Sequence, residues 1–337
     1  MNYLQHTQIN TVLYILIIIM IGACGQYIMT KLEDIKYPPI GKMVDVGGYK
    51  LHIHDLGESS GPTIVLDMGL GGNLLYWSLV QQEIAKFARV VSYDRAGIGW
   101  SDKSPWPKTN KNIVEDLHSL LHKAEIPGPY ILVGHSFAGI IARIYANKYP
   151  NEVVGVVLVD SSHEYQLQSE LPKPKDFLSR ILNLNIFHPV VVMASKIGLH
   201  RIFHLYNGES GSFDKKTQHM MIAKNSSIKF IETLLEEWRL FESNLEDAQT
   251  GKYILGAIPL VVITASMTPN EESCAKHGHA FPEVCNLAHK VWHELQKDLV
   301  TKSTNSKQVK AYNSGHIIQR DEPQIIIDTV REMLREL

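Results

Sequence analysis

Apolar and polar positions alternate along the chain in two periods. Short apolar runs predict buried strands, and apolar residues three or four positions apart predict helices. The predicted strands are a hairpin in "MVDVGGYKLHIHDLG", followed by "TIVLD", "RVVSYD", "YILVGH", "EVVGVVLVD", "IPLVVITAS" and "KQVKAYN". The predicted helices lie near 76–87, 112–124, 140–145, 291–300 and 323–334. Strands that alternate with helices imply an α/β fold with a mostly parallel sheet covered on both faces.

The alternation stops between residues 162 and 257. This segment contains helical patterns, such as "FLSRILNL" and "FIETLLEEWRLFESNL", and few strand signals. It is best interpreted as a helical insertion at the edge of the sheet, which we expect to form a lid. The predicted organisation is therefore a core at 40–161 and 258–337 with a helical lid at 162–257.

The N-terminal segment has a different pattern. "TVLYILIIIMIGACGQYIM", Thr11–Met29, contains no charged residue. It is long enough for the apolar part of a signal peptide and just long enough to span a bilayer. We therefore expect residues 1–30 to be a signal or anchor segment, and the protein to be membrane-anchored or exported. "IGAC" also resembles the lipobox of bacterial lipoproteins, in which Cys24 would be lipidated.

The side of the membrane stays open. No Lys or Arg precedes the apolar run, whereas Lys31, Lys36 and Lys42 follow it. By the positive-inside rule this arrangement favours a cytoplasmic body, whereas the lipobox favours export.

Composition narrows the choice of partners. The chain has 337 residues, 45% of them hydrophobic, and a formal net charge of −2. It can bury a large core, and without a basic stripe it offers no case for binding nucleic acid.

Cys274 and Cys285 enclose "AKHGHAFPEV" and suit a disulfide or free thiols. Together with His277 and His279 they could hold a metal, although the spacing matches no common zinc pattern.

The stretch "YILVGHSFAG" carries the strongest chemical signal. Ser136 lies where a predicted strand turns into a helix, between Gly134 and Ala138. Small residues at these positions relieve the crowding of a nucleophile elbow, in which the serine hydroxyl projects at a helix N-terminus. The usual pattern is G-x-S-x-G, and Ala138 replaces its last glycine, with Gly139 one position later.

A serine hydroxyl needs a base and an acid to act as a nucleophile. His316 follows the last predicted strand in "YNSGHIIQRDEP" and is the candidate base. Asp160, which ends "VVLVD", is the favoured acid, because a strand-end carboxylate is well positioned. Glu271 and Glu272, which follow "PLVVITA" at a distance, are the alternatives.

An oxyanion hole requires two backbone N–H donors. One is expected from Phe137, directly after the serine. The other is expected from Leu70, in the glycine-rich segment that follows "TIVLD". Trp77 and Phe137 are candidates for the wall of an acyl pocket, with packing in the core as the alternative.

These segments resemble the α/β-hydrolase fold superfamily. The resemblance rests on "DMGLGG", "YDRAGIGWSD", "VGHSFAG", "VVLVDSSHE" and "SGHIIQRDEP", which occur in family order. It covers residues 43–160 and 258–337, and Met68 departs from it by replacing a common histidine. It implies hydrolysis of an ester or related acyl bond through an acyl-serine, with no cofactor. It also implies a structural role for Asp94 and Arg95. A serine nucleophile excludes the mechanism of epoxide hydrolases and haloalkane dehalogenases, which use aspartate there.

The predicted function is that of a serine hydrolase acting on a small-molecule acyl substrate, with a carboxylesterase for small or medium acyl esters as the leading candidate. The lid and the membrane segment add modest support for lipid-like esters. Lipases, thioesterases, amidases and acyltransferases use the same residues. A non-catalytic binding module with this fold is the rival from another class. A dinucleotide site at "LDMGLGGNL" is disfavoured, because Leu74 occupies the place of the third small residue.

Overall fold

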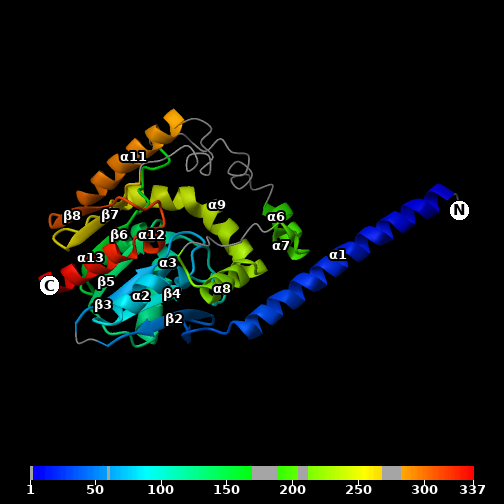
Figure 1. Ribbon diagram of the computed structural model, residues 1–337, viewed down its shortest axis with the longest axis horizontal. Helices are drawn as coiled ribbons and strands as arrows, with labels where there is room; N and C mark the ends of the chain where they lie inside the picture. The colour runs from blue at the N-terminus through cyan, green and yellow to red at the C-terminus, as the bar shows by residue number, and fades with distance from the viewer. Residues whose placement is uncertain (1–2, 59–60, 169–187, 204–211, 268–281) are drawn as a thin grey trace.

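The computed structural model describes residues 3–58, 61–168, 188–203, 212–267 and 282–337. Its centre is an eight-stranded sheet in the order β1-β2-β4-β3-β5-β6-β7-β8 (Figure 1). The strands are β1 (Lys42–Asp45), β2 (Lys50–Leu56), β3 (Thr63–Asp67), β4 (Val90–Asp94), β5 (Tyr130–His135), β6 (Val153–Val159), β7 (Leu260–Ala265) and β8 (Ser306–Ala311). Pairing is antiparallel from β1 through β4 and parallel from β4 to β8. The predicted hairpin and mostly parallel sheet are confirmed.

Helices cover both faces of this sheet. They are η1 (Leu74–Trp77), α2 (Ser78–Ile84), α3 (Asn110–Lys123), α4 (Ala138–Lys148), α11 (Pro282–Val300), α12 (Ile318–Asp321) and α13 (Pro323–Glu336). One hydrophobic core joins the sheet to α3, α4 and the end of α11, and a second joins the other face to α2 and α13. The helix predicted near residue 76 divides into η1 and α2. Helix α11 begins at Pro282 and not at residue 291, where the sequence predicted its start. The prediction started too late because the apolar spacing over the first turns is weak.

Four described helices lie between β6 and β7, within the predicted insertion. They are α6 (His188–Lys196), α7 (Leu199–Ile202), α8 (Lys215–Asn225) and α9 (Ile228–Gly251). Helix α9 is preceded by the N-cap residue Ser227, whose hydroxyl oxygen accepts a hydrogen bond from the N–H of Phe230. One face of α9 packs through Phe230, Ile231 and Leu235 against the body of the protein.

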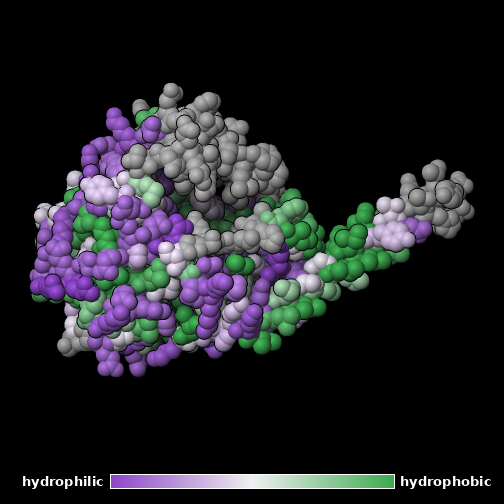
Figure 2. All heavy atoms as spheres, in the orientation of Figure 1, coloured by the Kyte–Doolittle hydropathy of each residue, from purple (hydrophilic) through white to green (hydrophobic). Residues whose placement is uncertain are grey.

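The N-terminal helix α1 (Tyr3–Lys36) extends away from the body (Figure 1). Within its section Ile9–Lys36, an 18-residue window has a mean hydropathy of 2.2 and 6% of its residues are buried, so by length and composition this helix can cross a membrane. Hydrophobic residues follow much of its surface (Figure 2). Cys24 is exposed on this helix.

The C-terminal half of α1 is attached to the helical insertion. Arg201 forms an ion pair with Glu33 at 2.7 Å and donates to the Gln26 side chain at 2.7 Å. Lys224 pairs with Asp34 at 2.9 Å. The apolar helix is therefore joined by polar contacts to α7 and α8 of the insertion.

Candidate active site

Ser136 lies at a sharp turn between β5 and α4. Its φ of 54° belongs to the left-handed region that side chains rarely adopt. A Cβ at Gly134 would lie 2.5 Å from the carbonyl oxygen of Ala138, so this position requires glycine. The turn therefore has the local geometry of a nucleophile elbow, with alanine accommodated at the last position of the pattern.

Three residues from separate parts of the chain meet at the carboxyl ends of the parallel strands. His316 Nε2 lies 3.1 Å from Ser136 Oγ, and His316 Nδ1 lies 2.7 Å from Asp160 Oδ2. Asp160, directly after β6, is 2% exposed and has a φ of 41°. The structure thus brings together the three residues that the sequence singled out. Glu271 and Glu272, the alternative acids, lie outside the described residues, as do Cys274, His277, His279 and the side chain of Cys285.

Both carboxylate oxygens of Asp160 take part in hydrogen bonds. Oδ1 accepts the backbone N–H of Ala265 at 3.0 Å and the indole N–H of Trp292 at 2.9 Å. The other oxygen remains for the imidazole, which then donates its Nδ1 hydrogen. In this tautomer the Nε2 lone pair of His316 faces the hydroxyl of Ser136, the orientation that a general base requires.

His135, the residue before the serine, contacts the loop that carries His316. Its Nε2 lies 2.8 Å from the carbonyl oxygen of His316, and the two rings are 4.6 Å apart. Burial and the nearby charge of His316 lower the pKa of His135 well below its usual value, so its ring stays neutral. It can donate one hydrogen bond that holds the backbone of His316. The sequence pattern gave no reason to select this histidine.

The segment Met68–Gly72 lies beside the serine. A Cβ at Gly69 would come within 2.8 Å of Ser136 Cβ. Arg95, which is 4% exposed, donates to the carbonyl oxygens of Met68 and, at 2.5 Å, of Gly69. The C=O of Gly69 and the N–H of Leu70 belong to one trans peptide and point in opposite directions. Because Arg95 holds that carbonyl, the Leu70 N–H is turned away from the guanidinium.

Glu237 of helix α9 connects this segment to the insertion. Its Oε2 accepts the N–H of Gly71 at 2.7 Å, and its Oε1 accepts from Arg95 Nε at 3.2 Å. Burial alone would lower the pKa of Arg95, but the carboxylates of Glu237 and Asp67 raise it, so the guanidinium stays charged. Sequence reasoning gave Arg95 only a structural role in a turn and did not select Glu237.

Phe137 occupies the N-cap position of α4, directly before its first residue. At this end of a helix the first backbone N–H groups have no partner within the helix. Its side chain is 1% exposed and packs edge-to-face against Phe241, with ring centroids 5.8 Å apart. Trp77 is also buried in a hydrophobic core. Both side chains therefore belong to the interior rather than to the cavity wall.

A cavity of about 660 Å³ opens above Ser136. Helix α9 contributes Phe230, Leu234, Trp238 and Phe241 to its wall, and α11 contributes Ala288 and Trp292. The remaining lining comes mainly from the segment that follows β3 and from the loops that carry Ser136 and His316. The space next to the hydroxyl is largely apolar, and one face of α9 forms much of it.

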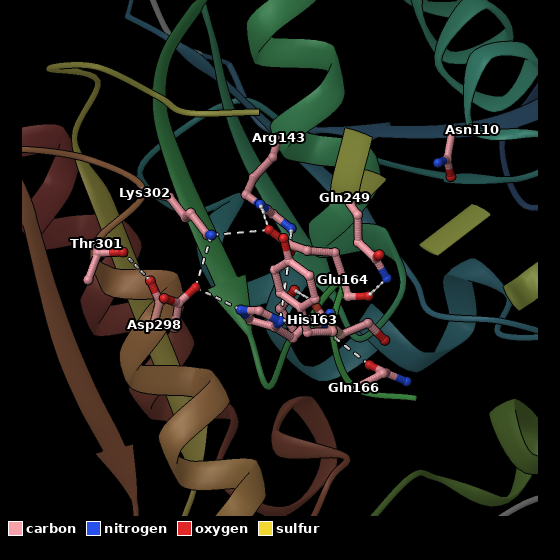
Figure 3. Close-up of polar contacts among 12 residues, drawn as sticks. Asn110, Arg143, His163, Glu164, Gln166, Gln249, Asp298, Thr301 and Lys302 are labelled. Atoms are coloured by element: carbon pink, nitrogen blue, oxygen red, sulfur yellow. Dashed lines mark hydrogen bonds and ion pairs between the residues drawn. The ribbon is translucent and has the colours of Figure 1, made fainter. Parts of the chain in front are cut away.

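The turn after Asp160 is fixed by a buried ionic network (Figure 3). Glu164, 2% exposed, pairs with Arg143 at 2.5 Å and with Lys302 at 3.1 Å. His163 lies 2.8 Å from Asp298 (Figure 3). Burial would raise the pKa of Glu164, but the charge of Arg143 and its hydrogen bond lower it to about 2. The network joins α4, α11 and the loop that carries the candidate acid.

Comparisons with known proteins agree with this architecture. A family model described as alpha/beta hydrolase fold matches residues 62–207. The uncharacterised protein YqjL of Bacillus subtilis is 25% identical over 285 residues, which cover 85% of this chain and 88% of YqjL. The crystal structure of Cfl2 from Burkholderia cenocepacia is similar with a TM-score of 0.67 and 19% identity, covering 87% of this chain and 95% of Cfl2. The Cif epoxide hydrolase of Acinetobacter nosocomialis is similar with a TM-score of 0.65 and 14% identity, covering 93% and 96%.

The chain has the α/β-hydrolase fold, and the family model of that fold matches part of it. The predicted fold class is confirmed, and this fold supports a hydrolase that acts on a small molecule.

Proposed function

We propose that the protein is a serine hydrolase that cleaves carboxylic esters or related acyl bonds, with Ser136 as nucleophile, His316 as general base and Asp160 as the orienting acid. The observation that carries this proposal is the pair of contacts made by His316, 3.1 Å from the serine oxygen and 2.7 Å from the aspartate. Distances of this size allow direct proton transfer.

The chemistry follows from these positions. Ser136 Oγ attacks the substrate carbonyl while its proton passes to His316 Nε2. The N–H groups of Phe137 and Leu70 stabilise the oxyanion that forms. His316 then gives the proton to the departing alkoxide, and an acyl-serine remains. A water molecule attacks this ester, its proton passes to His316, and the acid leaves as Ser136 regains its hydrogen.

The choice of reaction class depends on the nucleophile. An epoxide hydrolase is among the proteins of similar fold, and the resemblance implies an aspartate nucleophile for that class. Here a serine stands at the elbow, which favours acyl transfer. Thioesters, amides and transfer to an alcohol other than water use the same steps.

A non-catalytic binding module is the alternative from another class. It would keep the cavity of about 660 Å³ without turning over an ester. The contacts of Asp160 argue against it, because the N–H of Ala265, the indole N–H of Trp292 and the imidazole all converge on this single carboxylate. A protein that only binds has no need for that arrangement.

We also propose that the insertion at 162–257 acts as a lid and that α1 attaches the enzyme to a membrane. Four large apolar side chains are between 59% and 66% exposed on α6, at the end of α7 and directly after it, namely Val190, Met193, Ile202 and Phe203. Ile197, between them, contacts α1 at Gly22. An apolar lid surface beside an apolar anchor favours ester substrates that partition into lipid. Liposome flotation of the full chain tests the attachment, and failure to float contradicts it.

A hydrolysis screen over p-nitrophenyl esters of graded chain length tests the activity. The wild type should turn over at least one ester, and Ser136→Ala should lower kcat by up to about a million-fold without unfolding the protein. A mutant that keeps ordinary turnover contradicts the proposal. The absence of turnover on every ester, with binding retained, would favour the binding module.

A further inference from the structure

A second cluster of titratable side chains lies near the amino ends of the parallel strands, at the end of the sheet opposite Ser136. His118 and His122 are one helical turn apart on α3, and Glu152 directly precedes β6. Their ligand atoms lie within 4.8 Å of one another. The serine follows the carboxyl end of β5, whereas Glu152 stands before the amino end of its neighbour β6. A strand of this length separates the two places by about 20 Å.

The distances in this cluster match a metal-binding geometry. The Nε2 atoms of His118 and His122 lie 3.2 and 3.1 Å from the same oxygen, Glu152 Oε1. Zinc binds imidazole nitrogen and carboxylate oxygen at about 2.0–2.2 Å in a tetrahedron, so two of its ligands are about 3.4 Å apart. Both nitrogen–oxygen separations are within a few tenths of an ångström of that value. Small side-chain rotations would admit an ion.

Two of the three candidate ligands, Glu152 and His118, are already supported by their neighbours. Tyr145 donates its hydroxyl to the other oxygen of Glu152 at 2.7 Å. The ring of His118 stacks on Tyr149 at 3.9 Å and 11°. The backbone of Glu152 is bonded on both sides, to Tyr149 through its N–H and to Tyr130 through its carbonyl. Support of this kind fixes the orientation of metal ligands and raises affinity.

The chemistry of the donors selects the ion. Two imidazoles and one carboxylate suit zinc and its neighbours among the divalent transition metals, and not calcium or magnesium. His122 is 54% exposed, so a metal can enter from solvent and keep water as its fourth ligand.

We propose that His118, His122 and Glu152 form a binding site for a divalent transition metal, with zinc as the expected ion. The metal would join α3 to the loop between α4 and β6. Because it binds only the folded arrangement, it would stabilise this edge of the protein and take no part in the reaction at Ser136. This inference does not depend on the proposed hydrolase activity.

Zinc titration of the metal-free full chain in detergent, at neutral pH with a phosphine reductant, tests the proposal. Isothermal titration should detect a saturable site, and zinc should raise Tm by a few degrees. His122→Ala, a change at a half-exposed position, should weaken the binding at least tenfold and remove the rise in Tm. Glu152→Gln should weaken it by a similar factor.

Helix α11 provides a matched control. His289 and His293 have the same spacing, and their Nε2 atoms are 3.1 Å apart. Replacing both with alanine should leave the site on α3 intact. The proposal is overturned if wild type binds no zinc up to millimolar concentration. It is equally overturned if binding survives in His122→Ala and disappears in the α11 variant. Circular dichroism of each variant establishes that it is folded.

Discussion

Glu237→Gln tests whether the helical insertion positions the oxyanion donors. The substitution preserves shape and replaces one carboxylate oxygen with an amide NH₂. In the wild type, Glu237 accepts hydrogen bonds from the N–H of Gly71 at 2.7 Å and from Arg95 Nε at 3.2 Å, and the residue is 1% exposed. A glutamine retains an acceptor for only one of these donors, and its NH₂ would face the other.

The structure sets the size of the expected effect. Loss of a buried hydrogen bond that involves a charged group costs about 1.5–3 kcal/mol. If that energy is lost from the transition state, kcat falls about 10- to 150-fold. Complete removal of the Leu70 donor sets the upper limit, at about 10³-fold. The substrate itself does not need the oxyanion donors to bind, so KM should change by no more than a few-fold.

The assay is steady-state hydrolysis of the best p-nitrophenyl ester, with Tm measured in parallel. Glu242→Gln is the control, because it makes the same chemical change at an exposed position of the same helix. It should leave kcat and Tm near the wild-type values. If Glu237→Gln lowers Tm while kcat stays within about twofold of wild type, Glu237 contributes to stability alone. The link from α9 to the oxyanion segment is then wrong.

Three further substitutions test other parts of the site. Asp160→Asn should lower kcat on the order of 10⁴-fold with little change in fold, because its NH₂ would face the imidazole and force the wrong tautomer; a rate near wild type would mean that the acid is elsewhere. Glu164→Gln should destabilise the protein at pH 7 by about 3 kcal/mol, since the pKa of this group falls from 4.5 to about 2 on folding. That stability is present above pH 4.5 and is lost as pH falls towards 2, so acid unfolding of the variant should lack this component; equal free energies of unfolding at pH 7 would contradict the account. Gly69→Ala adds a methyl group 2.8 Å from Ser136 Cβ and should impair turnover, whereas Gly25→Ala, which meets nothing within 4 Å, should not.

The sequence was sufficient to predict the sheet and the meeting of three distant residues. Ser136 and Asp160 directly follow apolar strands, His316 follows the last strand, and parallel strands place their carboxyl ends at one end of the sheet. That topological rule needs no knowledge of side-chain packing, which explains why chain order alone carried the prediction.

The contacts between the core and the insertion could not be predicted in this way. Glu237 and Arg95 are 142 residues apart, and no periodicity relates a residue on α9 to the turn after β4. Trp292 and Asp160 are likewise 132 residues apart, and their contact depends on how α11 packs beside the strand ends. His135 has no signal in the sequence, since its role depends on a backbone carbonyl of the histidine loop. Such contacts follow from packing, which only the three-dimensional structure supplies.

The most direct test of the central claim is labelling with a fluorophosphonate, followed by peptide mapping in a mass spectrometer. Wild type should gain one adduct on Ser136, and His316→Ala should label far more slowly because the hydroxyl lacks its base. A folded wild-type protein that remains unlabelled, or that carries the adduct on another residue, would contradict the account of this site.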